Sequence, residues 1–164
     1  LTEQGAERLV FDVRNNPGGS VDSVCKALDR LLPEGKIMTL RTKAGKETVY
    51  TSDQDEVGLP MAVLVNADSI SAAEFFAAAL QEYGKAVIVG EQTIGKGYSQ
   101  QNYELSDGSA LHLSDQEYFT PNGKSLIGTG IQPDVPSSAP EGFDLYFADE
   151  QEDAQLQAAL AALG

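Results

Sequence analysis

Residues 66–100 read NADSISAAEFFAAALQEYGKAVIVGEQTIGKGYSQ, and this stretch decides how the rest of the chain is interpreted. Residues 71–83 leave little polar surface, and a helix that is apolar nearly all round is a buried helix. AVIVG at residues 86–90 is typical of a buried strand in a parallel sheet. Ser71 stands at the start of the helix, and Lys96 stands between two glycines after the strand. A hydroxyl and an amine brought together in this way can form a serine–lysine pair, which needs neither histidine nor metal.

The flanking segments predict an α/β fold for the first ninety residues. Strand, helix, hairpin, strand, helix and strand are expected in that order, with the first strand at residues 8–14 and the next buried strand at 61–66. Ser20 can cap the first helix, and the hairpin turns at Ala44-Gly45. Strands joined by helices in this order form parallel crossovers, so the sequence predicts a parallel sheet with helices packed on it.

The chain changes character after Lys96. YSQQNYEL and SALHLS alternate and are joined by Ser106-Asp107-Gly108, which predicts a second hairpin. Residues 128–142 are rich in glycine and proline and predict an irregular loop. DEQEDAQLQAALAAL at residues 149–163 predicts a helix at the end of the chain.

The composition of the chain excludes several classes of partner and cofactor. The chain has 164 residues, enough for one domain, and a net charge of −14, which argues against nucleic acid and anionic membrane surfaces as partners. The single cysteine, Cys25, lies on an apolar helix face and is interpreted as a core residue. With one cysteine and one histidine, no structural zinc site is expected, and no cofactor is implied. There is no signal-peptide pattern and no apolar run of 18 residues, and the opening LTEQGAERLVF leads us to expect a fragment of a longer precursor.

Ser71 and Lys96 each have an ordinary interpretation, as a helix cap and as a surface charge. The strand–turn–helix context of Ser71 instead favours an exposed nucleophile, and free N–H groups at the helix start favour a developing oxyanion. Lys96 can act as a general base only with a neutral amine, for which we expect it to be buried. Gln100 lies four positions on, and its amide oxygen could orient the amine.

The cluster NNPGG at residues 15–19 is the third candidate component. Its ordinary interpretation is a turn whose glycines adopt positive φ. Because parallel strands end at the same edge of a sheet, this loop can instead meet the Ser71 loop and donate a backbone N–H from Gly18 or Gly19 to the oxyanion. Asp12 and Arg14 are interpreted as a structural ion pair that holds this loop, without a chemical role. A Ser–His–Asp triad through His112 is an alternative that the sequence leaves open, although no flanking motif supports it.

Three segments together resemble the catalytic core of the C-terminal processing peptidases, also called tail-specific proteases: FDVRNNPGGSV at 11–21, the stretch from Val63 to Gln100, and residues 105–135. The resemblance covers about residues 8–135. The family's nucleophile is the middle serine of a Ser-Ala-Ser-Ala-Ser-Glu-like segment, which reads SISAAE at residues 69–74 of this chain. The resemblance therefore implies Ser71 as the nucleophile, and Ile70 and Ala73 are departures that remove no catalytic atom.

The same resemblance implies the other roles. The lysine of the family's Gly-Lys-Gly motif corresponds to Lys96, and the orienting glutamine corresponds to Gln100. Oxyanion donors are implied at the N–H of Ala72 and at one glycine of NNPGG, either Gly18 or Gly19. The implied fold is that of the crotonases and caseinolytic proteases, with stacked strand–strand–helix units.

The resemblance implies a serine endopeptidase that cleaves proteins near their C-termini through an acyl-enzyme, outside the cytoplasm, in the cell envelope or after secretion. Family members carry an N-terminal segment and a PDZ domain before this core, so residues 1–164 are expected to be the catalytic core of a longer chain. The partner implied is a protein or peptide tail, and the oligomeric state is left open. The alternative class is a non-catalytic domain of the same fold, which would bind apolar ligands or act as a scaffold.

Overall fold

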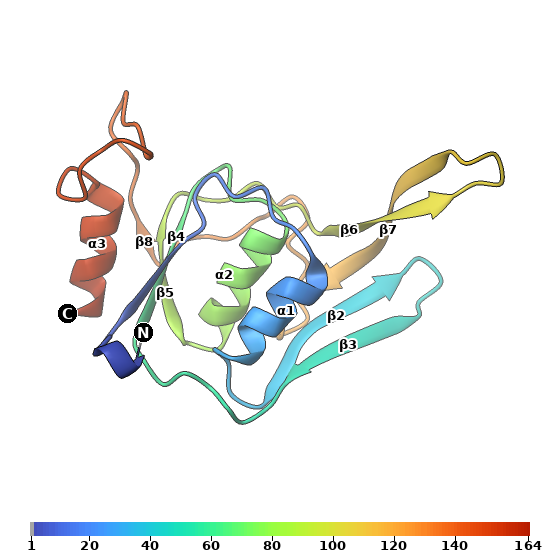
Figure 1. Cartoon of the computed structure of the whole chain (residues 1–164), viewed down its shortest axis with the longest axis horizontal. Coiled ribbons are helices and arrows are strands. Elements are labelled where there is room, and N and C mark those ends of the chain that lie inside the picture. Colours follow the sequence, from blue (N-terminus) through green and yellow to red (C-terminus); the bar gives the residue numbers. More distant parts are fainter. Residues whose placement is uncertain (1) are drawn as a thin grey trace.

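Two four-stranded sheets enclose two helices in the computed structural model, which describes residues 2–164 (Figure 1). The parallel sheet has the order β1 (Leu9–Asp12), β4 (Met61–Val65), β5 (Ala86–Gly90) and β8 (Val135–Pro136). The antiparallel sheet has the order β3 (Glu47–Ser52), β2 (Gly35–Thr42), β7 (Ala110–Phe119) and β6 (Tyr98–Glu104). The helices are α1 (Val21–Asp29), α2 (Ala72–Glu82) and α3 (Ala154–Leu163), and a 3-10 turn, η1, spans Thr2–Gln4. The predicted α/β architecture is confirmed.

The main core lies between the sheets and is centred on α2. Eight consecutive residues of this helix, from Ala73 to Leu80, are buried, as its apolar sequence predicts. Phe76 packs edge-on against Phe11 of β1 with ring centroids 5.2 Å apart, and Phe75 packs against Tyr118 of β7 at 5.5 Å. The helix thereby links the two sheets, and each buried aromatic ring contributes about 2–3 kcal/mol.

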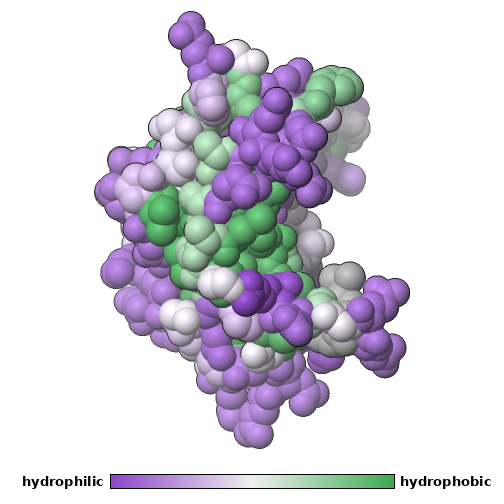
Figure 2. Space-filling model, turned by 90° about the vertical axis from the view of Figure 1, so that its left-hand side faces the viewer, coloured by the Kyte–Doolittle hydropathy of each residue, from purple (hydrophilic) through white to green (hydrophobic). Residues whose placement is uncertain are grey.

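Helix α3 packs on the outer face of the parallel sheet. Ala159 is fully buried there against Leu64 and Val89, in a second and smaller apolar cluster. Seen from the side that carries α3, apolar residues gather in the middle of the face and hydrophilic residues surround them (Figure 2). Asp153 caps the helix by accepting from the N–H groups of Gln155 and Leu156 at 3.1 and 3.0 Å. The helix therefore begins at Ala154, later than the acidic residues at 149–153 predict.

Three connections leave the parallel sheet at one edge. β1 pairs with β4 from Leu9↔Met61 to Asp12↔Leu64, and β4 pairs with β5 up to Val65↔Gly90. The loops after Asp12, Val65 and Gly90 therefore begin side by side, and they contain NNPGG, Ser71 and Lys96. Among residues 2–164, no helix combines the length and apolar character needed to cross a membrane.

The remaining differences from the expected elements are small. Helix α1 begins at Val21 behind the Ser20 cap, as predicted, but ends at Asp29 because Arg30 closes its last turn with an N–H bond to the carbonyl of Ala27. The second hairpin turns at residues 106–109 as predicted, but β7 continues to Phe119 because its last residues pair with β2. Cys25 is buried in the main core as predicted, and burial, with the charge of Asp22, raises the pKa of its thiol to about 12.

Candidate active site

One cleft of about 550 Å³ is lined by all the predicted catalytic and oxyanion residues. Its walls come from the loop before α1, the start of α2, the loop before β6, and the inner face of the antiparallel sheet. The predicted site residues that line it are Ser71, Lys96, Gln100, Ala72, Gly18 and Gly19. Loops from separate parts of the sequence are thus brought together at the edge of the parallel sheet.

Ser71 occupies a strained backbone conformation at the start of α2. Its φ is 59° and its ψ is −117°, a combination that residues other than glycine rarely adopt. Such a conformation costs about 1–3 kcal/mol and persists where surrounding contacts impose it, commonly at functional sites. Here the preceding residue, Ile70, donates its N–H to the carbonyl of Asn16 at 2.9 Å, which ties the serine turn to the NNPGG loop.

The carboxylate of Glu74 connects the serine turn to the lysine loop. Glu74 is completely buried, and its Oε2 accepts from the N–H of Ser71 at 2.8 Å and of Lys96 at 2.9 Å. Its Oε1 accepts from the N–H of Gly95 and the hydroxyl of Thr93, both at 2.6 Å. We call these five residues the Glu74 cluster. Four donors satisfy the buried charge and hold Ser71 and Lys96 on either side of one side chain.

Lys96 lies on a loop that is packed against residues 126–130. A Cβ at Gly95 would lie 2.4 Å from the carbonyl oxygen of Leu126, so only glycine allows this approach. The Lys96 ammonium donates to Oε1 of Gln100 at 3.3 Å, the contact that the spacing of four predicts. The side chain of Lys96 is exposed, however, so the burial that we expected is not provided by the described residues.

Tyr118 is a cleft residue that the sequence reading missed. Its hydroxyl donates to the carbonyl oxygen of Lys96. Burial raises the pKa of Tyr118, and the charge of Glu74 adds to the rise, against a lowering by the neighbouring Ser71 side chain. The phenol therefore stays protonated at neutral pH, lies beside Ser71 and is bonded to the backbone of Lys96. An aromatic residue in an alternating strand is usually a packing residue, so the sequence offers no signal for this contact.

The two glycines of NNPGG differ in their surroundings. Gly18 has φ +93°, and a Cβ there would lie 2.7 Å from the carbonyl oxygen of Ile70 and 2.9 Å from the nitrogen of Ala72. Its N–H already donates to Oδ1 of Asn16 at 2.9 Å. Gly19 has open space around its Cα. The loop thus presses its backbone against the start of α2 at Gly18 and faces the cleft at Gly19.

His112 also lines the cleft, on the exposed part of β7. Its Nδ1 lies 2.6 Å from Oδ1 of Asn102, its partner across the hairpin. Among residues 2–164, the side chain of Ser71 forms no hydrogen bond with His112 and none with the amine of Lys96, whose partner is Gln100. His112 is engaged by Asn102 instead, and none of the described carboxylates joins it to complete a triad. Within the same residues, no group of three or more histidine, cysteine, aspartate or glutamate side chains is arranged to hold a metal ion.

Glu74 and its partners also went unrecognised as a unit in the sequence. A glutamate in an otherwise apolar helix is a signal, because a buried carboxylate needs several donors. Three of the four donors come from residues 93–96, about twenty positions later, and sequence spacing does not identify them.

Comparison with known proteins gives a consistent family assignment. The sequence profile of peptidase family S41 matches residues 1–137. A probable CtpA-like serine protease from Staphylococcus epidermidis is 36% identical over 143 residues, which cover 85% of this chain and 29% of that protein. The solved photosystem II D1 C-terminal processing protease is 34% identical with a TM-score of 0.77, over 84% of this chain and 36% of that one.

A lipoprotein from Streptococcus agalactiae has a TM-score of 0.73 at 20% identity, over 96% of this chain and 54% of that one, and this likeness concerns the fold alone. The chain spans under a third of the length of the curated relatives that it matches.

Proposed function

This chain belongs to peptidase family S41, and we propose that it carries the catalytic centre of a serine endopeptidase with Ser71 as nucleophile and Lys96 as general base. The observation that carries the proposal is the strained backbone of Ser71, held at the start of α2 by the same carboxylate that binds the Lys96 loop. A helix cap needs no such strain, whereas a nucleophile presented to substrate at a strand–turn–helix junction commonly has it.

The reaction follows from the residues in the cleft. Neutral Lys96 takes the hydroxyl proton of Ser71 as the oxygen attacks the substrate carbonyl, and Gln100 orients the amine. The tetrahedral oxyanion is held by backbone N–H groups, for which we propose Ala72 and Gly19, since the N–H of Gly18 is engaged by Asn16. Lys96 then protonates the leaving amine, and water releases the acyl group from Ser71.

The exposure of Lys96 determines when its amine can lose its proton and act as a base. A lysine becomes neutral near physiological pH when its surroundings exclude water. We propose that a polypeptide lying in the cleft, over the apolar wall formed by Met38, Leu40 and Phe75, supplies this exclusion. The base would then form only when substrate is bound.

We infer the substrate class from the relatives. One solved relative at 34% identity is named for C-terminal processing, and we propose that this chain likewise acts near the C-termini of protein substrates. We further propose that residues 1–164 are the catalytic core of a longer protein in which a PDZ domain selects the tail, and that this protein works outside the cytoplasm. These assignments rest on the family resemblance.

The exposed lysine also favours a second candidate, a scaffold domain of the same fold without turnover. A fluorophosphonate probe separates the two, because it reacts only with an activated serine. We expect labelling of the full-length protein that disappears in Ser71→Ala and in Lys96→Arg, since arginine cannot deprotonate. A folded wild-type protein that takes no label, or full labelling of Lys96→Arg, would refute the proposed dyad.

A further inference from the structure

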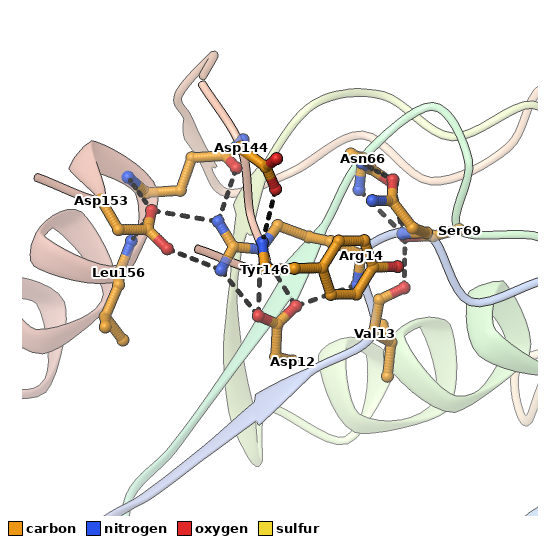
Figure 3. Close-up of polar contacts among 11 residues, drawn as sticks. Asp12, Val13, Arg14, Asn66, Ser69, Asp144, Tyr146, Asp153 and Leu156 are labelled. Carbon is orange, nitrogen blue, oxygen red and sulfur yellow. Dashed lines mark hydrogen bonds and ion pairs between the residues drawn. The ribbon is translucent and has the colours of Figure 1, made fainter. Parts of the chain in front are cut away.

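Arg14 is a buried cation that joins two distant parts of the chain (Figure 3). Its side chain is only 4% exposed and lies between two carboxylates. Toward Asp12, Nη2 donates to Oδ2 at 2.6 Å and Nε donates to Oδ1 at 3.0 Å. Toward Asp153, Nη1 and Nη2 donate to Oδ1 and Oδ2 at 3.0 and 2.7 Å. Both contacts are bidentate, the geometry in which arginine–carboxylate pairs are strongest and most directional.

A fourth side chain completes the arrangement, because Nη1 also donates to Oε1 of Gln155 at 3.0 Å. Gln155 in turn donates to the carbonyl oxygen of Ser137 at 2.7 Å. We call Arg14, Asp12, Asp153 and Gln155 the Arg14 cluster. Burial disfavours the charge on Arg14, but the two aspartates outweigh it and raise the pKa of the guanidinium. The guanidinium therefore stays charged, and each of its donor nitrogens has a side-chain acceptor.

The two aspartates differ in origin. Asp12 belongs to the same strand end as Arg14 and is 42% exposed, whereas Asp153 is 9% exposed and lies 139 positions away. Asp153 is also the N-cap of α3, so one carboxylate holds both the helix start and the guanidinium. Asp153 and Gln155 lie beyond residue 137, where the match to the peptidase family ends.

Arg14 immediately precedes the loop from which the oxyanion donor is proposed. Asn15 has φ 56°, and its backbone and side chain form a reciprocal pair of hydrogen bonds with the side chain of Asn66 at 3.0 and 2.7 Å. The hydroxyl of Ser69 donates to the carbonyl oxygen of Val13 at 2.7 Å (Figure 3). The backbone on either side of Arg14 is thus bonded to the turn that carries Ser71. A shift of Arg14 has a short covalent and hydrogen-bonded path to both parts of the site.

We propose that Asp153, acting through Arg14, sets the position of the 15–19 loop, so that this one residue of the C-terminal segment contributes to the geometry of the proposed catalytic site. In this role Asp153 is a positioning residue, because it touches neither substrate nor reacting atoms. The consequence for catalysis rests on the proposed function, whereas the mechanical coupling between α3 and the loop does not.

Hydrogen–deuterium exchange of the hydrogen-bonded amides of Asn15, Asn16 and Gly18 in the full-length protein tests the coupling directly. Asp153→Asn keeps the helix cap, since asparagine caps as well as aspartate, but removes the charge that pairs with Arg14. We expect exchange at these three amides to become about fivefold faster, because the loop loses an anchor at its base. The matched control is Asp149→Asn, which removes the same charge from the same segment without contacting Arg14. Equal exchange in both variants would overturn the coupling.

Steady-state kinetics test whether the coupling between Asp153 and the 15–19 loop affects catalysis. Deleting an oxyanion donor lowers kcat by about 10²–10³-fold, so displacing one should cost less, about tenfold, with KM unchanged. Ala159→Gly provides the second control, because it weakens α3 from within the small apolar cluster and leaves the Arg14 cluster intact. We expect it to lower Tm without lowering kcat. A loss of kcat in Ala159→Gly equal to that in Asp153→Asn would mean that α3 acts only through overall stability.

The proposed function and the proposed coupling can be refuted separately. Absence of fluorophosphonate labelling in the wild type contradicts the proposed function, and the exchange experiment still decides the coupling. Normal labelling with an unchanged kcat in Asp153→Asn contradicts the positioning role. Arg14→Lys offers a rescue test, since lysine keeps the charge but lacks the planar fork. Compared with Arg14→Met, we expect Arg14→Lys to restore part of the lost stability and a smaller part of the lost kcat. The reason is that the position of the 15–19 loop depends on the bidentate geometry.

Discussion

Glu74 and Arg14 are both buried charged side chains next to loops that line the cleft, but their partners come from different sources. Glu74 is satisfied by three backbone N–H groups and one hydroxyl, all within residues 71–96, and no cationic side chain of residues 2–164 pairs with it. Arg14 is satisfied only by side chains, and two of them come from the end of the chain. The Glu74 cluster therefore belongs to the matched peptidase region, whereas the Arg14 cluster depends on a segment outside it.

The difference has a physical consequence. Backbone donors stay in place as long as the loops are folded, so Glu74 holds Ser71 and Lys96 together with groups that cannot rotate away. Side-chain partners can rotate away, so Arg14 ties the 15–19 loop to a segment outside the matched peptidase region through contacts that are less fixed. We infer that the Glu74 cluster is essential to the site and that the Arg14 cluster tunes it.

The largest effect is expected for Glu74→Ala. Four buried donors lose their acceptor, and by analogy with broken buried charge networks the free energy of unfolding should fall by about 3–5 kcal/mol. Fluorophosphonate labelling of the folded fraction should be lost, because Ser71 and the Lys96 loop are no longer joined. Denaturant unfolding and labelling at low temperature measure the two effects.

Glu82→Ala is the matched control for that experiment. Glu82 ends the same helix and accepts from Thr120 and Asn122 at 3.0 and 2.9 Å, away from the cleft. It should lower stability while leaving labelling intact. If the fluorophosphonate labels Glu74→Ala as fast as Glu82→Ala, then Glu74 is not needed to join Ser71 to the Lys96 loop.

A smaller loss is expected for Arg14→Met. The change leaves Asp153 buried beside an apolar side chain, but the half-exposed Asp12 can be hydrated, so we expect about 2–3 kcal/mol of lost stability. Activity should fall but persist, in contrast to Glu74→Ala. Arg41→Met is the control, because the Arg41–Glu47 pair is about half exposed and should contribute about 1 kcal/mol or less. Complete loss of activity in folded Arg14→Met would erase the distinction between the two clusters.

Gly18→Ala should cost about 1–3 kcal/mol through backbone strain at φ +93° and crowding against Ile70 and Ala72. Because the crowded atoms belong to the serine turn, labelling should slow as well. Gly19→Ala adds a methyl group to open space and should leave stability within about 0.5 kcal/mol. Thermal unfolding of the pair measures the contrast, and equal Tm values would contradict the loop position described above.

The smallest effect is a pH dependence confined to the Arg14 cluster. Burial alone would raise the pKa of Asp153, but the hydrogen bond and charge of Arg14 and the N–H groups of α3 lower it below its ordinary 3.8. Its contribution to stability is therefore present above that value and is lost as the pH falls through the lowered one. The stability of Asp153→Asn should depend less on pH in this acidic range, as denaturant titrations would reveal. If the free energy of unfolding varies with pH as steeply in Asp153→Asn as in the wild type, the titration of Asp153 does not contribute to stability.

Much of the fold follows from local pattern. The buried strands and α2 follow from continuous apolar runs, and the hairpins follow from their turn residues. The meeting of the NNPGG loop with Ser71 and Lys96 was also predictable, because parallel strands end at one edge. The Asp12–Arg14 pair could be expected because the two side chains lie two positions apart on one strand end.

Long-range polar partners were not predictable in the same way. Nothing in the spacing identifies Asp153 as the partner of Arg14 across 139 positions, since packing of α3 on the outer face brings them together. The contact of Tyr118 with Ser71 likewise depends on how the antiparallel sheet curls over α2. The exposure of Lys96 differs from the expected burial, because a loop residue between two glycines need not be covered by the strands around it.

The most direct test of the central claim is a crystal structure of the fluorophosphonate adduct of the full-length protein. We predict a bond from phosphorus to Oγ of Ser71, with the phosphonyl oxygen about 2.7–3.1 Å from the backbone nitrogens of Ala72 and Gly19. Lys96 should lie beside the leaving-group side of the adduct, with Gln100 as its partner. An adduct on another residue, or a phosphonyl oxygen directed away from both nitrogens, would contradict the account.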